Sequence, residues 1–215
     1  GMTAFTFRRF IPAFRAMVEA GHEGGAAMVC QLNHGGRQVN TAQPGSRALA
    51  PSLEIFSEAK AQPQQELTET EVQRLIADFA RAADWCREAG FDGVQIHSAH
   101  GYLVSQFNSP LTNRRTDRWG GSAEKRRQFL LAVCAAVRAA VGPDYPVLVK
   151  QNVHDAHPQG LQVEDAIAIG QCLEAAGITA IELSGGIAET IPLAFRATEL
   201  RARGEAVFFE AECRR

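Results

Sequence analysis

Residues 91–121 read FDGVQIHSAHGYLVSQFNSPLTNRRTDRWGG, and this stretch decides the fold. Its apolar run Gly93–Ile96 is short enough for a buried strand, and polar residues begin as soon as that run ends. The segment EAGFDGVQI (88–96) is repeated in outline by EAAGITAIEL (174–183). Each has a helix end, a glycine, a short turn and a buried strand. This repeat predicts β/α units with parallel strands.

Four apolar runs are predicted to be buried strands, because each is short and lies close to a glycine or proline. They are Ala27–Leu32, Gly93–Ile96, Val147–Val149 and Ala180–Leu183. The fold class is therefore α/β. The favoured architecture is a partial (β/α)8 TIM barrel with about four parallel strands and their helices, and a doubly wound sheet is the alternative.

Helical patterns lie between the predicted strands. A capping box that begins at Thr68 predicts a helix that ends at Gly90. Ser122 is predicted to begin a second helix, and a third runs from about Val163 to Ala176. The second helix carries an apolar stripe at Phe129, Leu130, Val133, Val137 and Val141.

The region from Asn40 to Pro63 has little periodicity and many Pro, Ser, Gln and Ala residues. Loops of this length are usually functional or disordered. It leaves the first predicted strand at the carboxyl end, where barrel enzymes keep their catalytic residues. We interpret it as an active-site or assembly loop, with a surface excursion as the alternative.

The composition is that of an ordinary globular protein. The chain has 215 residues, of which 46% are hydrophobic and 21% are charged, and its formal net charge is −2. This charge provides no polybasic surface for nucleic acid or for anionic membranes. No apolar run reaches the roughly 18–20 residues of a membrane span. We expect one domain over residues 1–215, a small-molecule substrate, and no nucleic-acid or membrane partner.

The five cysteines are widely and irregularly spaced, and no two form a CxxC pair. This pattern is typical of free thiols in a reducing cytosol, and it favours neither a disulfide framework nor a zinc site. We therefore expect a cytoplasmic protein. The cysteines are Cys30, Cys86, Cys134, Cys172 and Cys213.

The polar residues after the second strand are the candidate catalytic group. His97 and His100 are three residues apart, and Tyr102 follows two residues later. Two imidazoles can hold one oxygen atom between them, and a neighbouring phenol can deliver a proton. This set suits reduction of a carbonyl-conjugated double bond. A single histidine on an apolar strand is usually a core residue, and a zinc site would need a third ligand that the neighbourhood does not offer.

Two other strand ends carry candidate cofactor contacts. Gln31 begins the run QLNHGGRQ, and its amide both donates and accepts, as the edge of a flavin pyrimidine requires. In the same run, Arg37 is predicted to hold the loop. Lys150 ends the third strand, where a buried cation can face the N1–C2=O edge of a flavin. A structural ion pair is the alternative for Lys150.

These motifs resemble those of the Old Yellow Enzyme family, the FMN-dependent ene-reductases and NADH:flavin oxidoreductases. The resemblance rests on QLNHGGRQ (31–38), on HSAHGY (97–102), on NRRTDRWGGS (113–122) and on SGG (184–186). It implies an FMN cofactor, NAD(P)H as reductant, and hydride transfer to an enone-type acceptor. It also implies that His97 and His100 bind the acceptor oxygen and that Tyr102 donates the proton.

The resemblance further implies that Gln31, Lys150 and Gly185 contact FMN. Lys150 stands where most of the family has arginine, which keeps the charge but loses the planar fork. The NRRTD run could suggest phosphate binding, and a structural role is favoured. His154, Asp155 and His157 are expected to be polar loop residues without a metal; a metal-dependent lyase that uses the two histidines is the disfavoured alternative.

The resemblance begins at about Phe10 and places the four strands as barrel strands 3–6. Strands 1, 2, 7 and 8, with the phosphate-binding loops after strands 7 and 8, have no counterpart in these residues. Four parallel strands alone leave two open edges. We therefore expect a homo-oligomer. The competing hypothesis is a non-catalytic half-barrel that self-associates and binds no flavin.

Overall fold

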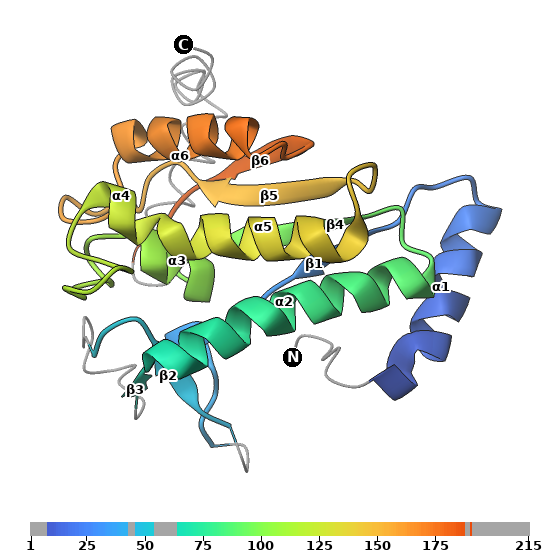
Figure 1. Ribbon diagram of the computed structural model, residues 1–215, viewed down its shortest axis with the longest axis horizontal. Helices are drawn as coiled ribbons and strands as arrows, with labels where there is room; N and C mark the ends of the chain where they lie inside the picture. Colours follow the sequence, from blue (N-terminus) through green and yellow to red (C-terminus); the bar gives the residue numbers. More distant parts are fainter. Residues whose placement is uncertain (1–7, 43–45, 54–63, 188–189, 191–215) are drawn as a thin grey trace.

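The computed structural model describes residues 8–42, 46–53, 64–187 and 190 (Figure 1). Its main sheet has four strands in the order β1-β4-β5-β6, and every neighbouring pair is parallel. The strands are β1 (Val29–Leu32), β4 (Gly93–Ser98), β5 (Val147–Asn152) and β6 (Ala180–Ser184). This order confirms the four predicted parallel strands, with boundaries that differ by one to three residues.

The helices alternate with these strands along the chain, and α1 precedes β1. They are α1 (Ile11–Glu23), α2 (Glu69–Ala89), α3 (Leu103–Asn108), α4 (Ala123–Arg126), α5 (Gln128–Val141) and α6 (Val163–Ala175), with 3-10 turns η1 (Arg8–Phe10) and η2 (Gly36–Gln38). Among the described residues no helix is long and apolar enough to span a bilayer.

The predicted signals at both ends of α2 are confirmed. The Thr68 hydroxyl accepts a hydrogen bond from the Glu71 amide at 3.3 Å, and the Glu71 carboxylate accepts one from the Thr68 amide at 3.0 Å. Gly90 ends the helix with φ of 96°, a left-handed conformation that costs glycine little. The helix predicted from Ser122 is instead two helices, α4 and α5, separated at Arg127.

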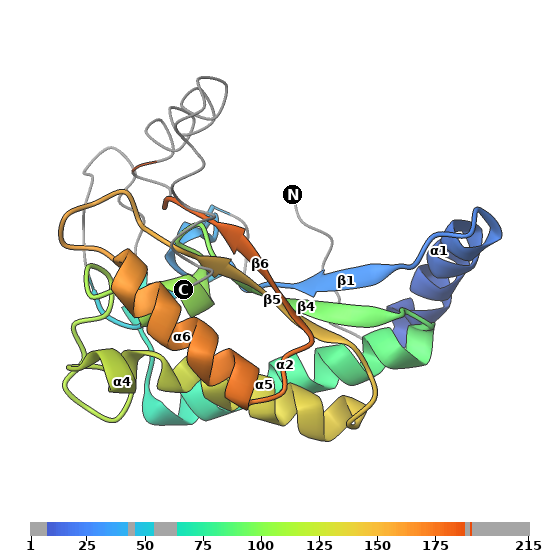
Figure 2. The same cartoon turned by 90° about the horizontal axis from the view of Figure 1, so that it is seen from above.

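One face of the sheet, called the outer face here, is covered by α2, α5 and α6, whereas none of the described helices covers the opposite, inner face (Figure 2). The predicted stripe on α5 is buried in the core beneath the outer face. Phe129 of this stripe stacks on Phe107 of α3 with ring centroids 4.1 Å apart. Complete burial of one such side chain contributes about 1.5–3 kcal/mol.

Strand alternation sends polar side chains to the inner face. Gln95 and His97 of β4 lie two residues apart, and the register places His97 beside Lys150 of β5 and Lys150 beside Glu182 of β6. The intervening residues of β4, such as Ile96, are buried in the core on the outer side. The two faces of one sheet therefore differ sharply in polarity.

A second, small parallel sheet was not predicted. It pairs β2 (Ala48–Ala50) with β3 (Gln64–Glu66), and β2 lies within the region interpreted as a loop. Arg115 ties this sheet to the loop after α3, because its guanidinium donates to the carbonyls of Pro51 at 3.0 Å and Leu67 at 2.7 Å. Residues 43–45 and 54–63 of the predicted loop, and Cys213, lie outside the described residues.

Candidate functional site

The three predicted catalytic side chains meet at the carboxyl end of β4. The ring centroids of His97 and His100 are 5.1 Å apart, and those of His97 and Tyr102 are 5.0 Å apart. Both pairs meet edge to face, with interplanar angles of 75° and 89°. The structure therefore brings all three predicted residues into one cluster.

The backbone turns sharply to build this cluster. His100 has φ of 61° and Gly101 has φ of 71°, so two consecutive residues adopt left-handed conformations. A positive φ is uncommon for a residue with a side chain and is often kept at functional sites. Tyr102 then stands directly before α3 as its N-cap residue. His100, which lies just beyond β4, is thus held at the carboxyl end of the main sheet.

His97 is a neutral hydrogen-bond donor in this arrangement. Its Nδ1 accepts the backbone N–H of Ala99 at 3.2 Å, which leaves the proton of the neutral ring on Nε2. Burial, followed by the charges of His100 and Lys150, lowers the pKa of His97 to about 4. The ring is therefore uncharged at neutral pH. No described residue accepts a hydrogen bond from its Nε2.

Three side chains to which the sequence analysis gave no role hold His100. Its Nε2 lies 2.6 Å from the Ser184 hydroxyl, and its backbone N–H donates to Asn152 Oδ1 at 3.2 Å. Gln38 donates from Nε2 to the His100 carbonyl at 2.8 Å. These contacts come from β6, β5 and the turn after β1. The strained residue is thus fixed from three sides.

A continuous polar row crosses the inner face below the rings. Gln31 Nε2 donates to Gln95 Oε1 at 2.6 Å, and Gln95 Nε2 donates to Glu182 Oε2 at 2.9 Å. Lys150 Nζ donates to Glu182 Oε1 at 2.8 Å. The row takes one residue from each strand of the main sheet. It includes two of the three predicted FMN contacts, Gln31 and Lys150, and adds Gln95 and Glu182.

Lys150 forms an ion pair with Glu182, which is the alternative that the sequence analysis gave for this residue. The hydrogen bond from Lys150, followed by that from Gln95, lowers the pKa of Glu182, so its carboxylate is charged at neutral pH. The Lys150 side chain is 20% exposed and that of Glu182 is 50% exposed. The pair therefore lies at an accessible surface and not inside the core. An ion pair here is compatible with a second role for Lys150 toward a ligand.

The NRRTD run holds loops together, which supports the structural role favoured from the sequence. Asn113 donates to the carbonyls of Phe107 and Trp119, both at 2.7 Å, and Arg115 pairs with Asp117 at 2.5 Å. Arg37, predicted to hold its loop, is buried.

The loop after β5 uses its polar residues internally. His154 Nε2 lies 2.9 Å from Gln162 Oε1, and the Asp155 carboxylate accepts the Leu161 amide at 2.8 Å. His157 Nδ1 accepts the backbone N–H of Gln159 at 3.1 Å. Within the described ranges, no group of three or more His, Cys, Asp or Glu side chains is placed to hold a metal ion.

Gly185 directly follows β6 and is partly exposed. A Cβ atom added there would lie 3.5 Å from the His154 carbonyl oxygen, which is an ordinary van der Waals distance. The protein itself therefore does not require glycine at this position. A close approach by a ligand, as predicted for Gly185, stays a prediction.

Gln95 and Glu182, to which the sequence analysis gave no role, carry one shared signal, the alternation of the strands. Gln95 lies two residues before His97, and Glu182 lies two residues before Ser184. Residues two apart on a strand share a face. Once His97 was assigned to the inner face, Gln95 could have been placed there as well. The partner of Gln95 across β5, in contrast, depends on the register.

The chain matches a sequence profile described as the NADH:flavin oxidoreductase / NADH oxidase family over residues 8–197. A metal reductase of Desulforamulus reducens is 44% identical over 190 residues, covering 88% of this chain and 28% of that protein. The chain thus spans well under half the length of that relative.

Two solved structures have the same fold. A complex of 2-naphthoyl-CoA reductase with 2-naphthoyl-CoA has a TM-score of 0.84 and 28% identity, over 88% of this chain and 31% of the other. An old yellow enzyme homologue from Zymomonas mobilis has a TM-score of 0.72 and 29% identity, over 80% of this chain and 52% of the other. These similarities confirm the predicted fold, part of a (β/α)8 barrel, and the resemblance to the Old Yellow Enzyme family.

Proposed function

The chain belongs to the NADH:flavin oxidoreductase / NADH oxidase family, and we propose that it serves as an FMN-dependent oxidoreductase that uses NAD(P)H and reduces an activated carbon–carbon double bond of the enone type. The observation that carries the proposal is the cluster of His97, His100 and Tyr102 beside a polar row on the inner face. FMN, when bound, supplies two-electron chemistry in the form of hydride transfer.

The side chains of the inner face fit the polar edge of a flavin ring. The interior of a TIM barrel is usually filled by branched apolar side chains. Here Gln31, Gln95, Lys150 and Glu182 form a hydrogen-bonded row instead. Gln31 would hold the pyrimidine edge with its amide. Lys150 would place a positive charge beside the ring, which favours the anionic reduced form.

The two histidines would bind the oxygen atom of the acceptor. The neutral ring of His97 offers its Nε2–H, for which no described residue is the acceptor. His100 is fixed beside it through Ser184, Asn152 and Gln38. Donors held in place before the reaction stabilise negative charge that grows on an oxygen atom. Replacing one such donor typically slows the chemical step by about 10²–10³-fold.

Tyr102 would donate the proton to the α-carbon of the acceptor. Its ring meets that of His97 at 5.0 Å, so the phenol lies next to the group that would hold the acceptor oxygen. Hydride addition to the β-carbon and protonation of the α-carbon together saturate the double bond. General acid catalysis of this kind contributes about 10²–10⁴-fold to the rate.

The experiment compares the two half-reactions in wild type, in Tyr102→Phe and in Tyr145→Phe. Tyr145 is the matched control, because its hydroxyl donates to the Phe91 carbonyl at 2.7 Å, beside the amino end of β4. In FMN-loaded protein, Tyr102→Phe should leave reduction by NAD(P)H unchanged and slow 2-cyclohexenone reduction by about 10²-fold or more. Equal loss in both half-reactions would refute the proton-donor role. Absence of flavin after incubation with FMN and desalting would refute the function.

We also propose that the chain self-associates. β1 and β6 are the outermost strands of the described sheet, and each carries an exposed apolar residue, Val29 at 46% and Leu183 at 45%. Unpaired strand edges and exposed apolar side chains favour association. Light scattering on the eluting protein should give a mass of at least two chains. A mass equal to one chain would refute self-association.

A cytoplasmic location is proposed from the cysteines. Cys30, Cys86, Cys134 and Cys172 are all free thiols among the described residues. Free thiols are typical of proteins in reducing compartments. Fractionation of cells that produce the protein should find it in the cytoplasmic fraction, and recovery outside it would refute the location.

A further inference from the structure

The hydrogen bonds of the polar row on the inner face run in one donor-to-acceptor direction, and Glu182 sets that direction. A charged carboxylate can only accept hydrogen bonds. Both oxygens of Glu182 are used, Oε1 by the Lys150 ammonium at 2.8 Å and Oε2 by the Gln95 amide at 2.9 Å. Gln95 must therefore turn its NH2 group toward β6. Its carbonyl oxygen is left pointing toward β1.

The same direction passes from Gln95 to Gln31. Gln95 Oε1 can only accept, so Gln31 meets it with Nε2 at 2.6 Å. A glutamine side-chain amide can be rotated by 180°, which exchanges the positions of its nitrogen and oxygen. Its hydrogen-bond partners decide which of the two orientations is adopted. The oxygen of Gln31 is left as the acceptor that this residue presents on the inner face. No described residue donates to it.

Glu182 also fixes the cation. Lys150 has four rotatable methylene groups, and a single hydrogen-bonded partner restricts its ammonium to one position. The ammonium of Lys150 shares its partner with Gln95, so the charge and the amide row are set together. One carboxylate thus controls two side chains that the proposed function assigns to FMN.

We propose that Glu182 is a positioning residue, which makes Gln31 present its oxygen and Lys150 present its charge to one bound ring. The ligand class that fits is a planar heterocycle with an N–H opposite Gln31 and an electron-rich atom opposite Lys150. The inference rests on the proposed function for the identity of the ring. The donor-to-acceptor direction of the polar row in the protein without FMN does not depend on the proposed function.

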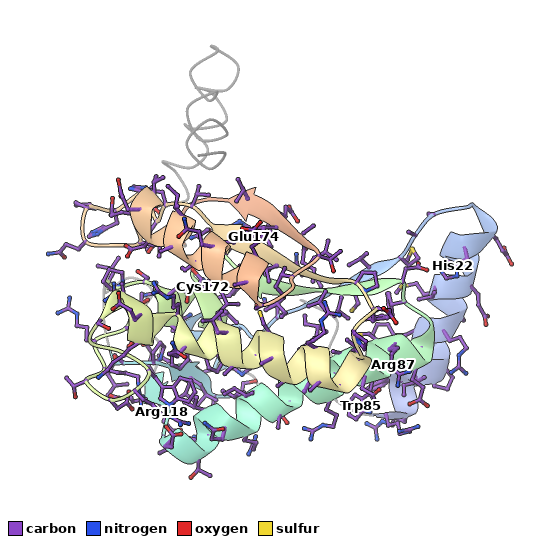
Figure 3. All side chains as sticks on the ribbon, turned by 45° about the horizontal axis from the view of Figure 1, so that its top comes forward. His22, Trp85, Arg87, Arg118, Cys172 and Glu174 are labelled. Carbon is purple, nitrogen blue, oxygen red and sulfur yellow. The ribbon has the colours of Figure 1, made fainter. Side chains whose placement is uncertain are left out.

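The first arm of the test uses the protein without FMN. Side-chain amide resonances of Gln31 and Gln95 are followed by NMR in wild type, in Glu182→Gln and in Glu174→Gln. Glu174 is an exposed carboxylate on α6, which packs on the outer face, and it is the matched control (Figure 3). Glu182→Gln should shift both amide groups, and Glu174→Gln should shift neither. Unchanged amide resonances in Glu182→Gln would overturn the proposal.

A pH titration of wild type serves the same purpose without any variant. The Gln95 amide should titrate together with the Glu182 carboxylate, because the two are hydrogen-bonded. The ionisable groups that interact electrostatically with Glu182 are Lys150, His97 and His100. The control is the Gln95 amide in Lys150→Gln, which should still titrate. A Gln95 amide that is insensitive to pH through the acid range would overturn the proposal.

The second arm measures FMN binding in a double-mutant cycle. Glu182→Gln should weaken binding by about tenfold, the loss expected for one hydrogen bond to a charged group. In the background of Gln31→Ala the same substitution should cost clearly less, because part of its effect passes through Gln31. Additive losses would overturn the proposal. If wild type binds no FMN, the proposed function fails, and the amide resonances alone decide the role of Glu182.

Discussion

The two faces of the main sheet are built from alternating residues of the same strands, yet they differ in polarity and in packing. On the outer face, Ile96 and Val149 are completely buried beneath helices. On the inner face, Gln95 and Lys150 take part in a hydrogen-bonded row that remains partly exposed. The outer face holds the fold together through apolar packing. We propose that the inner face carries the chemistry, because the apolar packing lies on the outer face.

The comparison makes a quantitative claim. Substitutions on the outer face should change the free energy of unfolding strongly, and those on the inner face should change ligand binding more than stability. His97 and Gln95 are exceptions, because both are on the inner face but buried. Four predictions test the comparison, in order of the expected change in stability.

The largest effect is expected at the center of the outer core. Phe129→Ala should lower the free energy of unfolding by about 3–5 kcal/mol, because it removes a completely buried ring and leaves a cavity. Denaturation by urea measures the change. Met17→Ala, at a side chain that is 47% exposed, is the control and should change stability by less than about 0.5 kcal/mol. Similar losses in both variants would break the comparison.

The second effect is a pH dependence that comes from His97. Its pKa is lowered to about 4 in the folded protein, against about 6.5 in the unfolded chain, so the unfolded chain binds more protons between these values. Stability should fall as the pH falls from about 6.5 to about 4, by roughly 2–3 kcal/mol from this residue. Urea denaturation of wild type and His97→Asn over this range measures it. Parallel curves for the two proteins would contradict the lowered pKa.

The third effect is at the start of α2. Thr68→Ala removes the hydroxyl of the capping box and should destabilise the protein by about 1 kcal/mol. The control is Thr70→Ala, an exposed position in the first turn of the same helix. Thermal melting compares them. A loss for Thr70→Ala as large as that for Thr68→Ala would show that the cap contributes nothing specific.

The smallest change in stability is expected on the inner face. Lys150→Gln removes a partly exposed ion pair, which typically contributes less than about 1 kcal/mol. FMN binding should nevertheless weaken by about tenfold, as expected for loss of a charged hydrogen bond. Urea denaturation and FMN titration on the same sample separate the two effects. A large loss of stability with unchanged FMN binding would reverse the roles of the two faces.

Local patterns predicted much of the fold. The apolar runs located all four strands of the main sheet, and the capping box located the start of α2. The local sequence patterns failed for elements that are too short to show a regular alternation of apolar and polar residues. β2 and β3 have three residues each, and the six residues of α3 follow Tyr102 directly.

The site was predictable to a similar extent. The spacing of His97, His100 and Tyr102 was sufficient to select them, and the structure brings their rings together. The link between Gln95 and Glu182 joins residues 87 positions apart and depends on the register of three strands. No local pattern contains that register. The left-handed backbone of His100 likewise depends on its contacts with other strands.

The most direct test of the central claim is a fluorescence titration of FMN with wild type, Gln31→Ala and Gln171→Ala. Gln31 lies in the inner row, and Gln171 is an exposed glutamine on α6, which covers the outer face. If the inner face holds the flavin ring, wild type and Gln171→Ala should quench FMN fluorescence saturably and equally, and Gln31→Ala should bind about tenfold more weakly. Equal binding by all three proteins, or no saturable binding by wild type, would contradict the claim.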